Sequence, residues 1–210
     1  MHPLRIKNCG LTTPETVMAA AESGAAFVGF VHHPPSVRHA AIDLIANLIA
    51  SAPPSLATVL VMVRPELSLL DTLLARFRPH YLQVHGFTDP ARIRTIAAHT
   101  NLPIITALHA DEGLGHAAAL EEVSAHLLFD AAVAGSGESF DWQPLQKLTL
   151  QQPWFLAGGL TAENVPEAIA STKAPMVDVS SGIEVTRGVK SIEKMAAFNR
   201  AALAAYAQAL

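Results

Sequence analysis

The residues best suited to chemistry are a cysteine and an aspartate, each at the end of a short apolar run. Cys9, the only cysteine, stands in IKNCGLT, and Asp130 ends LLFD. Taken singly, a free cysteine is more often a small buried hydrophobe, and an acid after a strand is often a helix cap. If parallel strands end at both, an acid and a thiol on two sides of a small molecule could transfer protons at two different atoms. This pairing suits an isomerase.

Small residues recur after three successive apolar runs. They are Gly135, Ser136 and Gly137, then Gly158 and Gly159, then Ser180, Ser181 and Gly182. Glycine is also the usual residue of any tight turn, so each cluster alone is weak evidence. Exposed backbone N–H groups in neighbouring loops can approach an oxyanion closely, and we predict that together they cradle a phosphate.

Further polar residues lie near the predicted strand ends. They are Lys7, Arg38, Gln83, His85 and Asp178. Arg38 carries a planar fork suited to a carboxylate or a phosphate, although an exposed arginine can also serve solvation alone. Lys7 stands two residues before Cys9, on the same face of the strand, and is a cation that would favour the thiolate.

Gln83 and His85 are two residues apart and share one strand face. His85 could carry a proton, bind a metal or form a hydrogen-bonded wall of the site. We favour a wall or a substrate contact, because ten histidines give no convincing metal-ligand spacing. No GxGxxG follows a strand and no GxxxxGK[ST] occurs, so neither a dinucleotide nor a nucleoside triphosphate is indicated.

Apolar runs alternate with amphipathic or alanine-rich runs along the chain. Eight strands are predicted, near residues 3–9, 25–31, 57–63, 81–86, 103–108, 126–131, 153–158 and 176–182. Eight helices are predicted, near residues 14–24, 40–52, 67–77, 89–99, 113–122, 141–147, 164–171 and 191–209. Recognisable helix starts are Thr13, Ser68, Asp89 and Ser191. Eight such units without a linker predict a single eightfold β/α (TIM) barrel domain over residues 1–210, with an open doubly wound sheet as the alternative.

Composition narrows the class of partner. The 210 residues are 50% hydrophobic and 15% charged, which is enough to bury one large core. Fourteen basic and eighteen acidic residues give a net charge of −4 without a basic run, so we expect no nucleic-acid partner. One cysteine forbids an internal disulfide, and no signal or membrane-spanning pattern is recognisable, so we expect a cytoplasmic protein without a membrane partner. Both a monomer and a homodimer are compatible with the helix patterns.

Several of these segments, taken in order, carry a family resemblance. The segments are KNCGLT, SVRH, LQVHG, LLFD, GSGESFDW, LAGGL and DVSSGIE. From Lys7 to about Lys190 the chain resembles the phosphoribosylanthranilate isomerase family of tryptophan biosynthesis. The resemblance implies an eightfold β/α barrel without cofactor or metal, acting on a small phosphorylated substrate. The implied reaction is the Amadori rearrangement of N-(5-phosphoribosyl)anthranilate to 1-(2-carboxyphenylamino)-1-deoxyribulose 5-phosphate.

The same resemblance implies roles for the residues. Cys9 would be the general base and Asp130 the general acid, while Arg38 would receive the anthranilate carboxylate. The small residues of the three loops would hold the phosphate. The remaining polar residues would contact the substrate, namely Lys7, Gln83, His85 and Asp178. An acid must keep its proton near neutral pH while a thiol gives up its own, so the pocket is expected to raise the pKa of the acid and lower that of the thiol.

Three positions depart from the family pattern. Asn8 stands inside the first strand, where an apolar residue is usual, and needs a hydrogen-bonding partner. Ala134 replaces a common glycine in a short loop after Asp130, and Ser191 replaces a frequent aspartate before the last helix. Two other functions stay open. Indole-glycerol-phosphate synthase or a dual-substrate sugar isomerase would share the phosphate loops without needing the thiol, and a binding protein could have kept the pocket and lost turnover.

Overall fold

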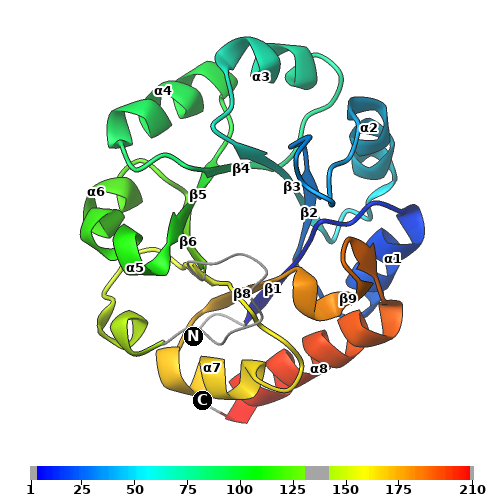
Figure 1. Cartoon of the computed structure of the whole chain (residues 1–210), viewed down its shortest axis with the longest axis vertical. Coiled ribbons are helices and arrows are strands. Elements are labelled where there is room, and N and C mark those ends of the chain that lie inside the picture. Colours follow the sequence, from blue (N-terminus) through cyan, green and yellow to red (C-terminus); the bar gives the residue numbers. More distant parts are fainter. Residues whose placement is uncertain (1–3, 131–141, 209–210) are drawn as a thin grey trace.

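A closed barrel of eight parallel strands forms the centre of the molecule (Figure 1). The computed structural model describes residues 4–130 and 142–208. The strands are β1 Arg5–Cys9, β2 Phe27–Val31, β3 Ala57–Val63, β4 Tyr81–His85, β5 Ile104–His109, β6 His126–Asp130, β7 Phe155–Leu156 and β8 Met176–Val179. Each strand pairs with the next, and β8 returns to β1 with Asp178 beside Lys7. The predicted barrel is confirmed, and the open sheet is wrong.

Helices surround this barrel as an outer ring (Figure 1). The α-helices are α1 Pro14–Glu22, α2 Ile42–Ser51, α3 Leu67–Leu74, α4 Pro90–Thr100, α5 Ala110–Gly113, α6 Ala117–Glu121, α7 Val165–Thr172 and α8 Ile192–Gln208. Short 3₁₀ segments are η1 Leu114–His116, η2 Gln143–Lys147 and η3 Ser181–Ile183. Within the described ranges, no helix has the length and apolar character needed to cross a membrane.

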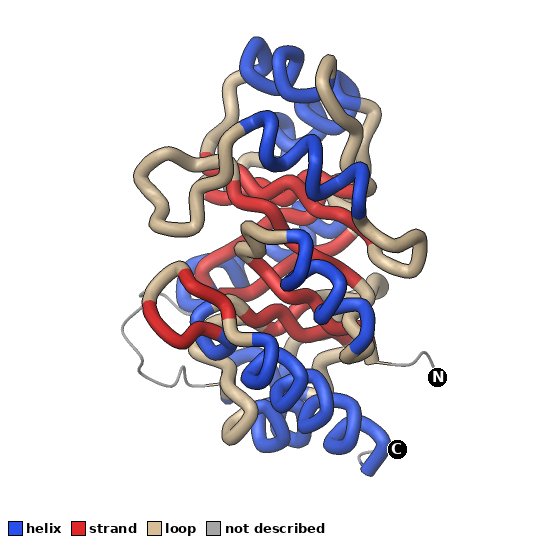
Figure 2. The backbone as a smooth tube through the Cα atoms, turned by 90° about the vertical axis from the view of Figure 1, so that its right-hand side faces the viewer, coloured by secondary structure: helices blue, strands red, loops and turns tan. Residues whose placement is uncertain are grey.

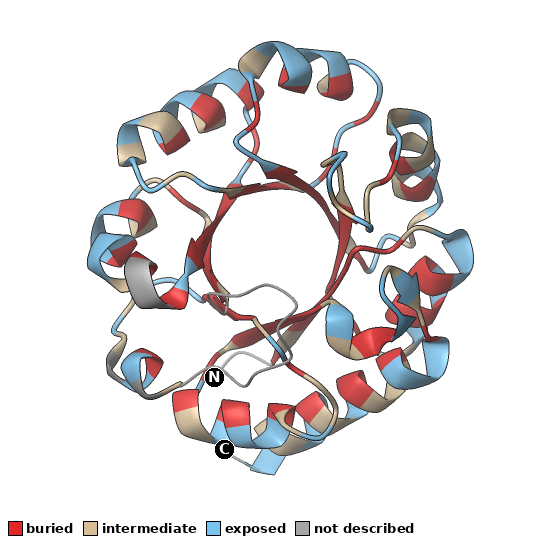
Figure 3. Cartoon of the chain, in the orientation of Figure 1, coloured by how far each residue is buried: buried red, intermediate tan, exposed pale blue. Residues whose placement is uncertain are grey.

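The alternation of side chains along each strand builds two apolar layers. Outward-facing residues such as Ile6 and Leu60 pack against the helices, while inward-facing residues such as Val59, Ile105 and Leu128 fill the barrel. Figure 3 shows that the strands are buried almost throughout. This double burial is why the strand sequences are apolar rather than alternating.

Aromatic residues at the first positions of several strands close the amino-terminal end of the barrel. The Phe27 ring lies 5.2 Å from that of Phe155 and 5.6 Å from that of Tyr81, between centroids. His126 packs 5.8 Å from both Tyr81 and Phe155, and the Arg5 guanidinium lies 4.2 Å from the Phe27 centroid. This end of the interior is therefore packed with large side chains and is no place for a ligand.

Three of the four predicted helix starts are confirmed by their capping bonds. Thr13 Oγ1 accepts from the Thr16 N–H at 3.3 Å, and Asp89 Oδ1 accepts from the Ala91 N–H at 2.9 Å. Ser191 Oγ accepts from the Lys194 N–H at 3.2 Å, so the departure at Ser191 keeps a cap on α8. The prediction for Ser68 is wrong, because α3 begins one residue earlier, after Glu66, without a side-chain cap.

The boundaries differ from prediction mainly in the second half of the chain. The helix expected near 113–122 is divided into α5, η1 and α6, in a segment that carries Gly113 and Gly115. The strand expected near 153–158 keeps only Phe155–Leu156, and the one near 176–182 ends at Val179. The helix near 141–147 is the 3₁₀ segment η2.

A two-stranded antiparallel sheet follows β8 and was not predicted. It consists of β9 Glu184–Thr186 and β10 Val189–Lys190, and Figure 2 shows it at one end of the barrel. Strands this short carry no detectable alternation, so no sequence pattern predicts them. Its position matters because it lies directly after the loop expected to bind phosphate.

Asn8 has the partner that its burial requires. Asn8 and Asn199 of α8 exchange reciprocal amide hydrogen bonds at 3.0 and 3.1 Å, and Asn199 Nδ2 also donates to Ser23 Oγ at 2.8 Å. The pair satisfies both buried amides and ties β1 to the last helix.

Candidate active site

Cys9 lies inside the barrel, at the rim where the strands end. It is the last residue of β1, is buried, and belongs to the inner apolar layer. Its register partner is Gly29 of β2, where an added Cβ would lie 2.8 Å from Cys9 Sγ. Glycine at position 29 therefore provides the space that the thiol occupies.

Lys7 lies one layer deeper on the same strand face and is fully buried. Its Nζ is 3.0 Å from Asp178 Oδ1 of β8. Burial works against the charge, but the nearby Asp178 and Cys9 outweigh it and raise the pKa of Lys7. Lys7 thus holds a fixed positive charge below the thiol.

The expected lowering of the thiol pKa is wrong for Cys9. Burial raises the pKa of the Cys9 thiol above its ordinary 9.0; the charge of Lys7 opposes this shift, Asp178 adds to it, and Lys190 opposes it. The physical reason is that complete burial removes the water that would solvate a thiolate, and Asp178 cancels part of the field of Lys7.

Asp130 is the last residue of β6 and lies at the same rim. It follows the alternation of the strand, in which Leu128 faces inward and Phe129 faces the helices, and it is partly exposed. The pKa of Arg38 is raised, first by its hydrogen bonds to Glu184 and also by the charges of Cys9 and Asp130. Both candidate catalytic groups are therefore within electrostatic reach of one guanidinium.

Arg38 lies in the loop after β2 and is held by a carboxylate of the protein. Its Nε donates to Glu184 Oε1 at 2.6 Å and its Nη2 donates to Glu184 Oε2 at 3.0 Å. Gly10, with φ of 76°, leaves room for this side chain, since a Cβ there would lie 2.8 Å from Arg38 Cδ. Solvation alone is thus the wrong interpretation of Arg38.

Gln83 and His85 share the inward face of β4, as predicted. Gln83 Nε2 and His85 Nε2 are 2.8 Å apart, and Gln83 Oε1 is buried with no hydrogen-bond partner among the described residues. Burial, and next the charge of Lys7, lowers the pKa of His85 to about 4. His85 is therefore a neutral imidazole at physiological pH and forms a polar wall of the interior.

The loops after β7 and β8 pack directly against each other. Gly158 and Gly159 have positive φ angles of 91° and 62°, and Asn164 Nδ2 donates to the Gly159 carbonyl at 2.9 Å. A Cβ at Gly182 would lie 2.0 Å from the Leu160 carbonyl oxygen, so only glycine permits this approach. Gly159 and Ser181 are exposed, so both loops reach the surface of the molecule. The predicted residues Gly135, Ser136 and Gly137 lie outside the described residues.

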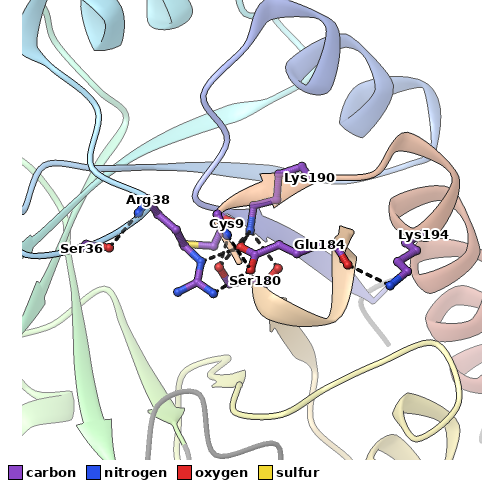
Figure 4. Close-up of polar contacts among 8 residues, drawn as sticks. Cys9, Ser36, Arg38, Ser180, Glu184, Lys190 and Lys194 are labelled. Carbon is purple, nitrogen blue, oxygen red and sulfur yellow. Dashed lines mark hydrogen bonds and ion pairs between the residues drawn. The ribbon is translucent and has the colours of Figure 1, made fainter. Parts of the chain in front are cut away.

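Two residues that sequence reasoning did not propose complete the site, Glu184 and Lys190 (Figure 4). Lys190 Nζ donates to Glu184 Oε1 at 2.7 Å, to the Ser180 carbonyl at 2.8 Å and to Ser180 Oγ at 3.1 Å. Ser180 Oγ in turn donates to the Cys9 carbonyl at 3.1 Å. The available signal was a pair of opposite charges on the two sides of the Arg187–Gly188 turn, immediately after DVSSG.

The donor set of this rim suits proton transfer on an anionic molecule. A carboxyl group and a thiol are available for protons, and Arg38, Lys7 and exposed backbone N–H groups can attract negative charge. Among the residues that the structure describes, no three His, Cys, Asp or Glu side chains are grouped as metal ligands.

The sequence is similar to known proteins over nearly its whole length. The chain matches the family model described as N-(5'phosphoribosyl)anthranilate (PRA) isomerase over residues 6–201. It is 42% identical over 209 residues to the N-(5'-phosphoribosyl)anthranilate isomerase of Beijerinckia indica, covering 95% of this chain and 94% of that protein.

Two solved structures are similar over the same length. One is a phosphoribosylanthranilate isomerase in complex with reduced 1-(o-carboxyphenylamino)-1-deoxyribulose 5-phosphate, with 29% identity, a TM-score of 0.81 and coverage of 95% of this chain and 98% of that chain. The other shows monomers generated from the dimeric enzyme of Thermotoga maritima, with 27% identity, a TM-score of 0.81 and the same coverage.

Proposed function

The chain belongs to the N-(5'-phosphoribosyl)anthranilate isomerase family of tryptophan biosynthesis, and we propose that Cys9 and Asp130 carry out its rearrangement as general base and general acid. The substrate is N-(5-phosphoribosyl)anthranilate, and the product is 1-(2-carboxyphenylamino)-1-deoxyribulose 5-phosphate. The single barrel domain would carry out the whole reaction. The observation that carries the assignment is the rim itself, where β1 ends at the Cys9 thiol and β6 ends at the Asp130 carboxyl group, both on the inward face of the barrel.

Two proton transfers account for the reaction. Asp130 gives a proton to the furanose ring oxygen as the bond from that oxygen to C1′ breaks, and the nitrogen lone pair forms the C1′ iminium. Cys9 as thiolate then takes the C2′ proton, and the C–H electron pair forms the C1′–C2′ double bond and returns the nitrogen to a neutral amine. The enolamine tautomerises to the ketone when the Cys9 thiol gives its proton to C1′ and the C2′ hydroxyl gives its proton to Asp130, so both groups return to their starting forms.

The raised pKa of the Cys9 thiol is compatible with this role. A thiolate of higher pKa is a stronger base, although a smaller fraction of the enzyme holds it at neutral pH. The iminium that forms beside it carries a positive charge, which would counteract the burial that raises the pKa of Cys9. The Cys9 thiolate would thus be favoured at the step in which it takes the C2′ proton.

The mouth of the barrel is the carboxyl-terminal rim that carries Cys9 and Asp130. Charges and backbone groups on opposite sides of this mouth would bind the two ends of the substrate. Glu184 occupies the Nε–Nη2 edge of Arg38, and the Nη1–Nη2 edge offers a second bidentate face for the anthranilate carboxylate. The phosphate would lie at the backbone N–H groups of Gly159, Ser181 and Gly182, with Gly158 and Ser180 shaping the loops. Lys7, Gln83, His85 and Asp178 would line the floor beneath the ribose.

The decisive experiment follows the fluorescence of the anthranilate group. Freshly prepared phosphoribosylanthranilate, mixed with the purified protein, should lose this fluorescence as product forms, whereas Asp130→Asn should bind the product and convert substrate far more slowly. Binding without conversion by the parent protein would instead identify a chain that kept the pocket and lost turnover. An Asp130→Asn variant within a few-fold of the parent in kcat would refute the acid assignment.

A further inference from the structure

We propose that Glu184 is a positioning residue that orients Arg38 toward the carboxylate of the substrate, and that Lys190 anchors it. This inference rests on the proposed function, in which Arg38 receives that carboxylate. Glu184 would then determine the preference for a carboxylated aryl amine without touching the substrate.

The geometry of the Arg38–Glu184 contact is that of a rigid fork. Both carboxylate oxygens are engaged, at 2.6 Å from Nε and 3.0 Å from Nη2, and the Glu184 side chain is 5% exposed. A guanidinium held along one edge keeps its plane fixed, because rotation about any side-chain bond would break one of the two bonds. The Nη1–Nη2 edge is thereby presented in one orientation.

Glu184 is itself held from three other directions. Lys190 Nζ donates to Oε1 at 2.7 Å, and the Gly188 N–H donates to Oε2 at 3.1 Å. Lys194 Nζ donates to the Glu184 carbonyl at 2.8 Å, which fixes the backbone to α8. The Lys190 side chain is 1% exposed, so this anchor is buried. Figure 4 shows Arg38, Glu184 and Lys190 converging beside Cys9 and Ser180.

Backbone packing supports the same link between two distant loops. Gly188, at the β9–β10 turn with φ of 90°, lies so near the loop after β2 that a Cβ there would be 3.0 Å from the Val37 carbonyl oxygen. Gly10 leaves space for the Arg38 side chain itself. The hairpin therefore packs on the residue next to Arg38 as well as on its guanidinium, which a chance surface ion pair would not do.

The charges explain why an acid is needed at this position. Arg38 and Lys190 both contact Glu184, so without it two cations would repel each other in a largely buried place. The pKa of Glu184 is lowered to about 2: burial would raise it, but the hydrogen bonds from Arg38 and Lys190 outweigh burial. Glu184 is thus ionised throughout the physiological range, and one net positive charge remains for an anionic substrate.

The test compares Glu184→Gln with the parent enzyme on two substrates, phosphoribosylanthranilate and the corresponding aniline derivative, which lacks the carboxylate. We expect the KM for the first to rise on the order of tenfold, as for a lost charge-assisted contact. The KM for the second should change by less than about threefold, and kcat should change little for both. A merely structural role would alter both substrates alike, and that result would overturn the proposal.

A double-mutant cycle provides the second readout. In an Arg38→Leu background, Glu184→Gln should add no further rise in KM, because its effect passes through the arginine. Glu167→Gln removes the same charge from an exposed site on α7 and serves as the matched control. If Glu184→Gln does not fold, Glu184→Gln with Lys190→Met removes both buried charges and is tested in the same way. Additive effects in the cycle would refute the proposal.

Failure of this inference is distinguishable from failure of the proposed function. If the parent protein does not convert phosphoribosylanthranilate, the proposed function is wrong. If the parent converts it and Glu184→Gln retains the parent KM for both substrates, only the role of Glu184 is wrong.

Discussion

The two ends of the barrel interior use the same strands and the same inward-facing positions, but opposite chemistry. At the amino-terminal end, Phe27, Tyr81, His126 and Phe155 pack edge to face in the first positions of their strands. At the carboxyl end, two to four residues further along, some inward positions are charged or reactive, as at Cys9 and in the Lys7–Asp178 pair.

This difference separates stability from function within one set of strands. Aromatic packing at the closed end contributes favourable burial and dispersion, whereas buried charges at the mouth are costly to desolvate and seldom stabilise a fold. The mouth keeps such groups because they bind an anion and move protons. Variants at the two ends should therefore fail in different ways.

The largest effect is expected at the mouth, for Cys9→Ala. Loss of a general base should lower kcat about 10²–10⁴-fold, the usual contribution of proton transfer by a positioned side chain. The free energy of unfolding should fall by only about 1 kcal/mol, because one sulfur atom leaves a small space beside Gly29. Steady-state kinetics and urea unfolding measure the two quantities. A kcat within a few-fold of the parent would remove Cys9 from the mechanism.

The corresponding experiment at the amino-terminal end of the barrel is Phe27→Ala. This ring contacts Tyr81, Phe155 and the Arg5 guanidinium, so its loss should lower the free energy of unfolding by about 3–5 kcal/mol. Turnover per folded molecule should stay near the parent value, since the ring lies at the amino-terminal end of the interior, two residues before Gly29, the register partner of Cys9. Urea unfolding and kinetics below the transition check both parts. A kcat loss larger than the loss of folded protein would break the separation between the ends.

The contrast between the two ends also shows which features of the fold and of the site can be predicted from the sequence. Eight apolar strands and the rule that barrel sites follow strand ends were enough to gather Cys9, Asp130 and Arg38 at one rim. The partners of the buried polar groups were not predictable, because Arg38 and Glu184 are 146 residues apart and Asn8 and Asn199 are 191 apart. Such pairs depend on how loops and helices pack, and no local pattern encodes them.

The pKa of Cys9 shifts in the direction opposite to the one that the sequence predicts, for a related reason. The cation Lys7 was visible two residues away, but the shift depends on whether burial or charge is larger. Burial of a side chain to this degree, and the position of Asp178 beside Lys7, follow from closure of the barrel between β8 and β1. The sequence therefore predicts which charged residue lies near Cys9, but it does not predict whether burial or charge has the larger effect on the pKa of the thiol.

An effect of similar size, but a sharper comparison, is expected for the Lys7–Asp178 pair. Lys7→Met should cost about 3–5 kcal/mol, because it leaves the Asp178 carboxylate buried without its cation. Lys7→Met with Asp178→Leu should recover much of that loss while remaining inactive. Urea unfolding of the two variants tests this, with Asp178→Leu alone completing the cycle. If the double variant is as unstable as Lys7→Met, the pair stabilises the fold and the mouth is not purely functional.

The smallest effect is the loss of folding stability at low pH, and the lowered pKa of Glu184 determines its sign. The folded pKa of about 2 lies below the ordinary 4.5, so the unfolded chain binds the proton more readily between these values. The contribution is therefore complete above about pH 5 and is lost as the pH falls toward 2, with a size of about 3 kcal/mol. His85 and His126 are also buried and have lowered pKa values, so the protein loses the stability that their neutral forms contribute from about pH 6.5 downward.

Comparison with Glu184→Gln separates these contributions. The two histidines titrate in both proteins, so the difference in unfolding free energy between the parent and Glu184→Gln reports the carboxylate alone. That difference should be constant from about pH 7 to 5 and should shrink steadily below, as measured by urea unfolding at each pH. A difference that stays constant down to pH 3 would mean that Arg38 and Lys190 do not stabilise the ionised carboxylate. The mouth would then lack the charge balance that distinguishes it from the aromatic end.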